Sequence, residues 1–222
     1  MRERPFELYV FDWDGTCMDT TPFIAGAIQE AARAMGLPVP SYEVAEGVIG
    51  LGHADMMRIA VPACPESAYG RFDQEYWKAY IKGEERLSGI RPGMQRLLER
   101  MKAAGLWSAV ATGKSRRGLE RVMGKTGTKS LFVSMATADE HASKPAPDML
   151  LSLSEELCVP LSRMVMVGDA VHDLDMAKNA GVAGVAVLWG AGKRPELEAR
   201  GPRAVVADER ELARSLGLED LL

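Results

Sequence analysis

Acidic residues follow two of the short apolar runs in this 222-residue sequence. Asp12 and Asp14 come directly after an apolar run near the N-terminus, and Asp169 and Asp173 follow a later one. Four carboxylates in one pocket repel one another unless a cation is present, and ligands that are all oxygen suit a hard ion such as Mg²⁺. The sequence therefore predicts a magnesium site, whereas it offers no cluster of cysteine and histidine for zinc.

A hydroxyl and an ammonium group occupy similar places. Thr112 ends another apolar run and is followed by Gly113, and Lys144 stands before a proline in a loop. These two side chains suit an anionic substrate, and glycines such as Gly15 and Gly113 let backbone N–H groups approach a phosphate closely. We expect all of these groups to meet at one sheet edge, since ligands of open α/β sheets bind at the carboxyl ends of the strands.

The elements that would position them alternate between strand and helix. Short apolar runs predict strands over residues 7–11, 107–111, 131–135, 164–167, 182–188 and 203–206. Apolar residues at helical spacing predict helices over 93–104, 115–125, 148–158, 174–180 and 209–216. This alternation predicts an α/β fold with a Rossmann-like parallel sheet covered on both faces.

One stretch interrupts the alternation. Between about residues 20 and 83 the pattern predicts only helices, over 22–35, 42–49, 54–60 and 66–82, flanked by linkers near 17–20 and 84–91. We expect a helical cap over residues 17–87, inserted after the first strand, and a core formed by residues 1–16 and 88–222.

The motifs resemble those of the haloacid dehalogenase superfamily, in particular its phosphoglycolate phosphatase-like branch with a helical cap. Asp12-Trp13-Asp14-Gly15-Thr16 resembles the first motif, Thr112-Gly113 the second and Lys144-Pro145 the third. Gly168-Asp169-Ala170-Val171-His172-Asp173 resembles the fourth. The resemblance covers most of the chain, and the motifs stand in the order that the family has.

The resemblance implies a role for each motif. Asp12 would attack phosphorus to form an aspartyl-phosphate, and Asp14 would act as general acid and then as general base. Mg²⁺ would be held by Asp12, by the Asp14 carbonyl, by Asp169 and, directly or through water, by Asp173. The remaining motif residues, Thr112, Gly113 and Lys144, would bind the transferring phosphoryl group. The implied activity is hydrolysis of a small-molecule phosphate monoester.

Alternatives within and beyond the family remain at this stage. Members that cleave carbon–phosphorus bonds have alanine at the position of Asp14, and dehalogenases lack the Asp-x-Asp pair, so both are disfavoured. Sugar phosphomutases keep both aspartates and are the alternative enzyme class. A catalytically idle protein that retains the fold is the alternative of another kind, which the intact motif set disfavours.

The cap would close over the site and contact the substrate. Thr20 and His53 are the candidate substrate-binding residues, with Thr21 beside them. Three basic residues are weaker candidates, because a solvated helix face is their more common setting: Arg58, Lys78 and Lys82.

Charge, the first residues and cysteine content indicate which partners and which cellular compartment to expect. The chain has 27 basic and 31 acidic residues, a formal net charge of −4, which gives no reason to expect nucleic acid or a membrane surface as partner. Its charged first residues lack the apolar stretch of a secretory signal, and the three cysteines have no paired spacing. We expect a cytoplasmic protein, monomeric or homodimeric, that acts on a small molecule.

Overall fold

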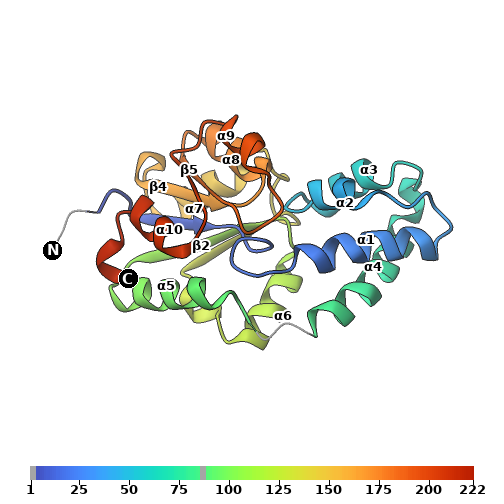
Figure 1. Ribbon diagram of the computed structural model, residues 1–222, viewed down its shortest axis with the longest axis horizontal. Coiled ribbons are helices and arrows are strands. Elements are labelled where there is room, and N and C mark those ends of the chain that lie inside the picture. Colours follow the sequence, from blue (N-terminus) through green and yellow to red (C-terminus); the bar gives the residue numbers. More distant parts are fainter. Residues whose placement is uncertain (1–3, 86–88) are drawn as a thin grey trace.

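A parallel six-stranded sheet with helices on both faces forms one end of the molecule, and a helical unit forms the other, in a computed structural model that describes residues 4–85 and 89–222 (Figure 1). The strands are β1 (Leu8–Phe11), β2 (Trp107–Thr112), β3 (Ser134–Thr137), β4 (Met164–Gly168), β5 (Ala183–Val187) and β6 (Ala204–Val206). Their order is β3-β2-β1-β4-β5-β6, and all neighbours are parallel. The α/β expectation is confirmed.

The central position of β1 explains its composition. All four residues of β1 are buried, because helices cover both faces of the sheet and leave no polar side for alternating residues. Its neighbours β2 and β4 pair with it in register, with Phe11 opposite Val110 on one side and Val167 on the other. The loops that follow these three strands therefore leave the sheet side by side.

Helices of the core pack on the two faces of the sheet in two large apolar clusters, with a smaller third cluster around Leu197. They are α5 (Pro92–Ala103), α6 (Arg116–Thr126), α7 (Asp148–Leu157), α8 (Val171–Ala180), α9 (Arg194–Glu198) and α10 (Glu209–Ser215), with 3₁₀ turns at Lys129–Leu131, Leu161–Arg163 and Glu219–Leu221. Leu119 of α6 and Leu212 of α10 belong to one cluster, and Leu150 of α7 and Met176 of α8 belong to the other.

Two predicted elements of the core differ from the structure by two or more residues at an end. The third strand, predicted over 131–135, was wrong by three residues at its start, because Lys129–Leu131 forms a 3₁₀ turn and pairing with β2 begins at Ser134. The helix predicted over 174–180 begins earlier, at Val171, because the Asp173 carboxylate accepts a hydrogen bond from the Ala170 N–H and caps its first turn.

In its described residues, the insertion after β1 contains helices and no strand, as predicted. It contains α1 (Thr21–Ala34), α2 (Tyr42–Gly47), α3 (His53–Ala60) and α4 (Tyr69–Glu84), with a 3₁₀ turn at Glu66–Ala68 where a single helix over 66–82 had been expected. Helices α1 and α4 lie side by side (Figure 1). Side chains from these helices form an apolar cluster separate from those of the sheet, with Ile28, Met57 and Phe72 fully buried in it.

This separate cluster supports the division into a cap over 17–87 and a core of 1–16 and 88–222, which we keep as a proposal. Cys17 and Met18 at the first crossing still pack within the core cluster, and the cap cluster starts at Ile24. The second boundary, part of the predicted linker over 84–91, and the first three residues fall outside the described residues.

Candidate active site

The residues singled out in the sequence lie around the carboxyl edge of the sheet. Asp12 and Asp14 follow β1, Thr112 ends β2, and Asp169 follows β4. Because β1 lies between β2 and β4, these groups come from three adjacent strands. A backbone hydrogen bond of 2.9 Å from the Asp12 N–H to the Val167 carbonyl joins the first and fourth motifs.

Lys144 forms the centre of a buried ionic cluster. Its ammonium lies 2.6 Å from Asp12 Oδ1 and 2.6 Å from Asp173 Oδ1, and all three side chains are at most 2% exposed. Burial alone would lower the pKa of Lys144, but the two carboxylates outweigh it and raise that pKa. The Lys144 ammonium is therefore charged, and the loop after β3 is held against the first and fourth motifs.

Asp169 is held on both of its carboxylate oxygens. The Thr16 hydroxyl donates to Oδ1 at 2.8 Å, and the Ala191 N–H donates to Oδ2 at 2.8 Å. The backbone at Gly15 and Gly190 can approach the Asp169 carboxylate closely because glycine has no side chain. A Cβ on either glycine would lie within 2.3 Å of Asp169. Thr16, inside the first motif, thus orients a candidate ligand from the fourth.

The cluster has three carboxyl groups around one ammonium. Burial raises the pKa of Asp12 well above its usual value, with Lys144 opposing the shift and the other aspartates adding to it. Burial, together with the nearby Asp173 carboxylate, raises the pKa of Asp169 to about 7. An oxygen from each of these three aspartates lies within 4.8 Å of the other two, so the donor set fits a hard divalent cation.

Asp14 turns toward the cap instead of joining this triad. Its Oδ1 accepts a hydrogen bond of 2.6 Å from the Thr20 hydroxyl and lies 3.0 Å from the ammonium of Lys114. Lys114 in turn donates to the Tyr80 hydroxyl of α4 at 3.0 Å and lies over that ring. Thr20, which was predicted to bind substrate, thus contacts the candidate general acid Asp14. The role of the Asp14 carbonyl as a metal ligand stays a prediction.

Lys114 is the main residue that the sequence analysis missed. Its side chain is only 9% exposed, and it links the candidate general acid to the cap. The available signal was its position directly after Thr112 and Gly113, in a loop already assigned to the site. The sequence alone does not mark this lysine as a site residue, because its partner Tyr80 lies in another part of the chain.

The second motif also touches the cap through its backbone. A Cβ at Gly113 would stand 2.4 Å from the Leu51 carbonyl oxygen and 2.6 Å from that of Gly50. Nearby, the Gly52 N–H donates to the Ser143 hydroxyl at 2.7 Å. The cap therefore lies directly on the loops that follow β2 and β3.

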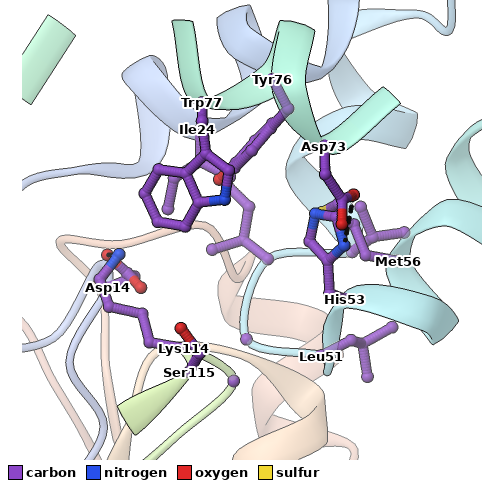
Figure 2. A pocket seen from close by; sticks show the side chains of 14 residues that line it. Asp14, Ile24, Leu51, His53, Met56, Asp73, Tyr76, Trp77, Lys114 and Ser115 are labelled. Carbon is purple, nitrogen blue, oxygen red and sulfur yellow. Dashed lines mark ion pairs between the residues drawn. The ribbon is translucent and has the colours of Figure 1, made fainter. Parts of the chain in front are cut away.

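Between the cap and these loops lies a cavity of about 230 Å³ (Figure 2). The core contributes Asp14, Gly113 and Lys114 to its wall, and the cap contributes His53 and Asp73, so the predicted cap residue His53 does face the site. The full lining is Asp14, Ile24, Val48, Ile49, Gly50, Leu51, His53, Met56, Asp73, Tyr76, Trp77, Gly113, Lys114 and Ser115.

The basic candidates of the cap are placed in solvent. Arg58 and Lys78 are 71% and 65% exposed and pair with acidic neighbours on their own helices, and Lys82 is exposed as well. Thr21 is buried at the start of α1. The three basic residues thus lie on solvent-exposed helix faces, which was the more common setting expected for them.

Comparison with known proteins identifies the family. The sequence pattern described as haloacid dehalogenase-like hydrolase matches residues 9–187, and the chain belongs to this family. It is 28% identical to a phosphoglycolate phosphatase from Vibrio parahaemolyticus over 96% of each chain, and 31% identical to the probable phosphatase IndB from Dickeya dadantii over 90% of this chain and 88% of that one.

A solved structure shows the same fold. The crystal structure of a predicted phosphoglycolate phosphatase from Haemophilus somnus superposes with a TM-score of 0.84 at 25% identity, over 95% of this chain and 97% of that one. Within residues 4–85 and 89–222, no helix has both the length and the apolar character to cross a membrane. The cytoplasmic location stays a prediction.

Proposed function

We propose that this phosphatase of the haloacid dehalogenase-like family hydrolyses a small-molecule phosphate monoester with magnesium, using Asp12 as nucleophile. The observation that carries the proposal is the buried cluster in which Lys144 contacts both Asp12 and Asp173 at 2.6 Å beside Asp169. Burying this many charges is expensive unless a ligand and a cation use them.

Asp12 is suited to nucleophilic attack. Burial raises the pKa of Asp12, and the Lys144 ammonium at Oδ1 opposes this shift and so favours the ionised form, the form that attacks phosphorus. Attack forms an aspartyl-phosphate and expels the alcohol of the ester, and water then releases inorganic phosphate. Dividing the reaction in this way replaces one difficult step by two easier ones.

Asp14 is suited to proton transfer. It lines the cavity where the leaving alcohol would lie, and Thr20 and Lys114 both hold its Oδ1. As general acid it would protonate the leaving oxygen, and as general base it would take a proton from the attacking water. Because both residues hold Oδ1, we assign the transferred proton to Oδ2 of Asp14.

The transferring phosphoryl group would be bound by the Thr112 hydroxyl, the Gly113 N–H and the Lys144 ammonium. Asp12, Asp169 and Asp173 would hold Mg²⁺, with the Asp14 carbonyl as a further ligand. When bound, the cation supplies positive charge that offsets the carboxylates and the phosphate, as phosphoryl transfer requires. Electrostatic positioning of this kind supplies most of the catalysis in such sites.

Turnover of a generic aryl phosphate tests the proposal. We expect release of inorganic phosphate with Mg²⁺ and none after chelation by EDTA, and the names of the relatives make phosphoglycolate the reference ester. Failure to hydrolyse any ester of a broad panel would identify an idle protein with this fold. Conversion of a sugar 1-phosphate to its isomer with little free phosphate would instead identify a phosphomutase.

A further inference from the structure

Four arginines of the core border a second cavity, which is separate from the one beneath the cap. Helices α5 and α10 contact each other (Figure 1), and residues of both line a surface cavity of about 530 Å³. The arginines are Arg96 and Arg100 on α5 and Arg210 and Arg214 on α10. Because the members of each pair are four residues apart, they lie on the same face of their helix. Two pairs of guanidinium groups thus face one cavity from two helices.

The fold itself does not explain this arrangement of like charges. Arg100 donates a hydrogen bond to the Leu221 carbonyl, but the side chains of Arg96, Arg210 and Arg214 have no hydrogen-bond or ion-pair partner among residues 4–85 and 89–222. Like charges four residues apart on a helix repel each other and destabilise it. The arginines therefore cost stability in the isolated protein, and a bound anion would offset that cost.

The acidic side chains at this cavity are engaged by other groups. Asp208 Oδ1 accepts hydrogen bonds from the N–H groups of Arg210 and Glu211, at 2.9 and 2.8 Å, and thereby caps the first turn of α10. Glu209 lies 3.4 Å from Nε of Arg91, which is not one of the four arginines. Within the described part of the chain, four basic side chains thus line the cavity against two acidic ones.

The residue type and the size of the cavity indicate which anion would fit. A guanidinium group donates two parallel N–H bonds to a phosphoryl group, which makes arginine better suited than lysine to recognise phosphate by shape. One arginine pair can hold one phosphoryl group, and the second pair can hold another. The volume of about 530 Å³ lies in the range of roughly 300–1,000 Å³ that is usual for small-molecule sites. Leu97 and Leu221 add apolar surface beside the arginines.

We propose that the cavity between α5 and α10 binds a diphosphate, a compound with two linked phosphoryl groups, each held by one arginine pair. An organic group on that diphosphate would lie against Leu97 and Leu221. The site shares no described lining residue with the cavity under the cap, and its binding of a diphosphate does not depend on the proposed phosphatase function.

Titration calorimetry of the full chain with inorganic pyrophosphate, without added Mg²⁺, measures the binding. Without the cation, the carboxylates of Asp12, Asp169 and Asp173 repel anions from the active site, so the arginine cavity dominates the signal. We expect Kd for pyrophosphate to be lower by about tenfold or more than Kd for inorganic phosphate or sulfate, because only pyrophosphate engages both pairs. Equal Kd values for the three anions, or no binding of pyrophosphate, would overturn the proposal.

Substitutions in the two pairs locate the bound anion. Arg96→Met and Arg214→Met each remove one guanidinium group, and we expect Kd for pyrophosphate to rise about tenfold in each variant and about 100-fold in the double variant. Arg96→Lys keeps the charge but not the planar group, so its Kd should lie between those of the wild type and Arg96→Met.

Arg33→Met is the matched control for charge. Arg33 is an exposed arginine of α1 in the cap, and it also has no side-chain partner in the described ranges. Its replacement changes the net charge by the same amount and should leave Kd for pyrophosphate unchanged. Unchanged Kd in the Arg96→Met, Arg214→Met double variant, or an equal rise in Arg33→Met, would show that the cavity does not hold the anion.

Thermal unfolding separates a binding role from a structural one. Since Arg96 and Arg214 have no partner in the described residues, their replacement by methionine should leave Tm equal or raise it slightly. Pyrophosphate should raise Tm of the wild type and leave that of the double variant unchanged. A double variant with a clearly lower Tm would show that these arginines stabilise the fold, contrary to the proposal. With Mg²⁺, kcat/KM for an aryl phosphate should be the same in both proteins, because neither arginine lies in the proposed active site.

Discussion

Gly113 lies in the loop that we propose binds phosphate, where this loop contacts the cap, and Gly113→Ala is expected to separate the two. The added Cβ would lie 2.4 Å from the carbonyl oxygen of Leu51 and 2.6 Å from that of Gly50. Ordinary contact begins near 3.4 Å, so the cap loop must withdraw by about 1 Å. Backbone oxygens cannot rotate away as a flexible side chain can, and alanine keeps the N–H at this position.

The size of the effect follows from the cost of overpacking. Inserting a methyl group into a well-packed contact costs about 1–3 kcal/mol, which corresponds to a decrease of about 5- to 150-fold in the equilibrium constant for cap docking. The strain falls on cap docking and not on the sheet, because an undocked cap relieves it. We therefore expect kcat/KM to fall by about tenfold or more while Tm stays close to that of the wild type.

Steady-state phosphate release and thermal unfolding measure the two quantities. Gly124→Ala is the matched control, since that glycine lies in α6 with nothing within 4 Å of the added Cβ, and it should leave kcat/KM unchanged. Gly113→Ala activity within twofold of the wild type would refute the close docking of the cap. A loss of activity that merely follows a large drop in Tm would refute the assignment of the strain to docking.

Two further predictions concern buried charge. Lys114→Met leaves the Asp14 carboxylate without its cationic partner, which costs about 3 kcal/mol of stability. We expect Tm to fall by roughly 10 °C in a thermal melt, and an unchanged Tm would contradict the ion pair. Burial raises the pKa of Asp169 to about 7 in the native metal-free protein, whereas in the unfolded chain this carboxyl group loses its proton near pH 4. The native state therefore binds the extra proton between about pH 4 and pH 7, and the free energy of unfolding falls as pH rises through this range. Mg²⁺ should therefore raise Tm more at about pH 7.5 than at about pH 5.5 relative to EDTA, and equal shifts at both would count against metal binding at Asp169.

The sheet edge could be predicted because its signals are local in sequence. Apolar runs end at Asp12 and at Asp169, and parallel strands carry such ends to one place. The third strand was displaced because an apolar run also suits the 3₁₀ turn at Lys129–Leu131 that precedes β3. Pattern alone does not reveal which backbone hydrogen bonds such a run will make.

The cap contacts depend on how two separately packed units meet. Asp73 is one of several charged residues along α4, and nothing in its local sequence marks it as the partner of His53 on α3. Lys114 acquires its partner Tyr80 in the same way, through docking of the cap on the core. Pairings of this kind are set by tertiary packing and not by periodicity, which is why the cavity wall became visible only in the structure.

Covalent capture of the phosphoryl group tests the central claim most directly. The enzyme is mixed with a radiolabelled phosphate monoester and Mg²⁺, quenched in acid within the first turnover, and digested to locate the label. We predict label on the peptide that contains Asp12, and neither label nor turnover in Asp12→Asn, which should keep its native circular dichroism spectrum. Full turnover by Asp12→Asn, or label on a different residue in the wild type, would contradict the account.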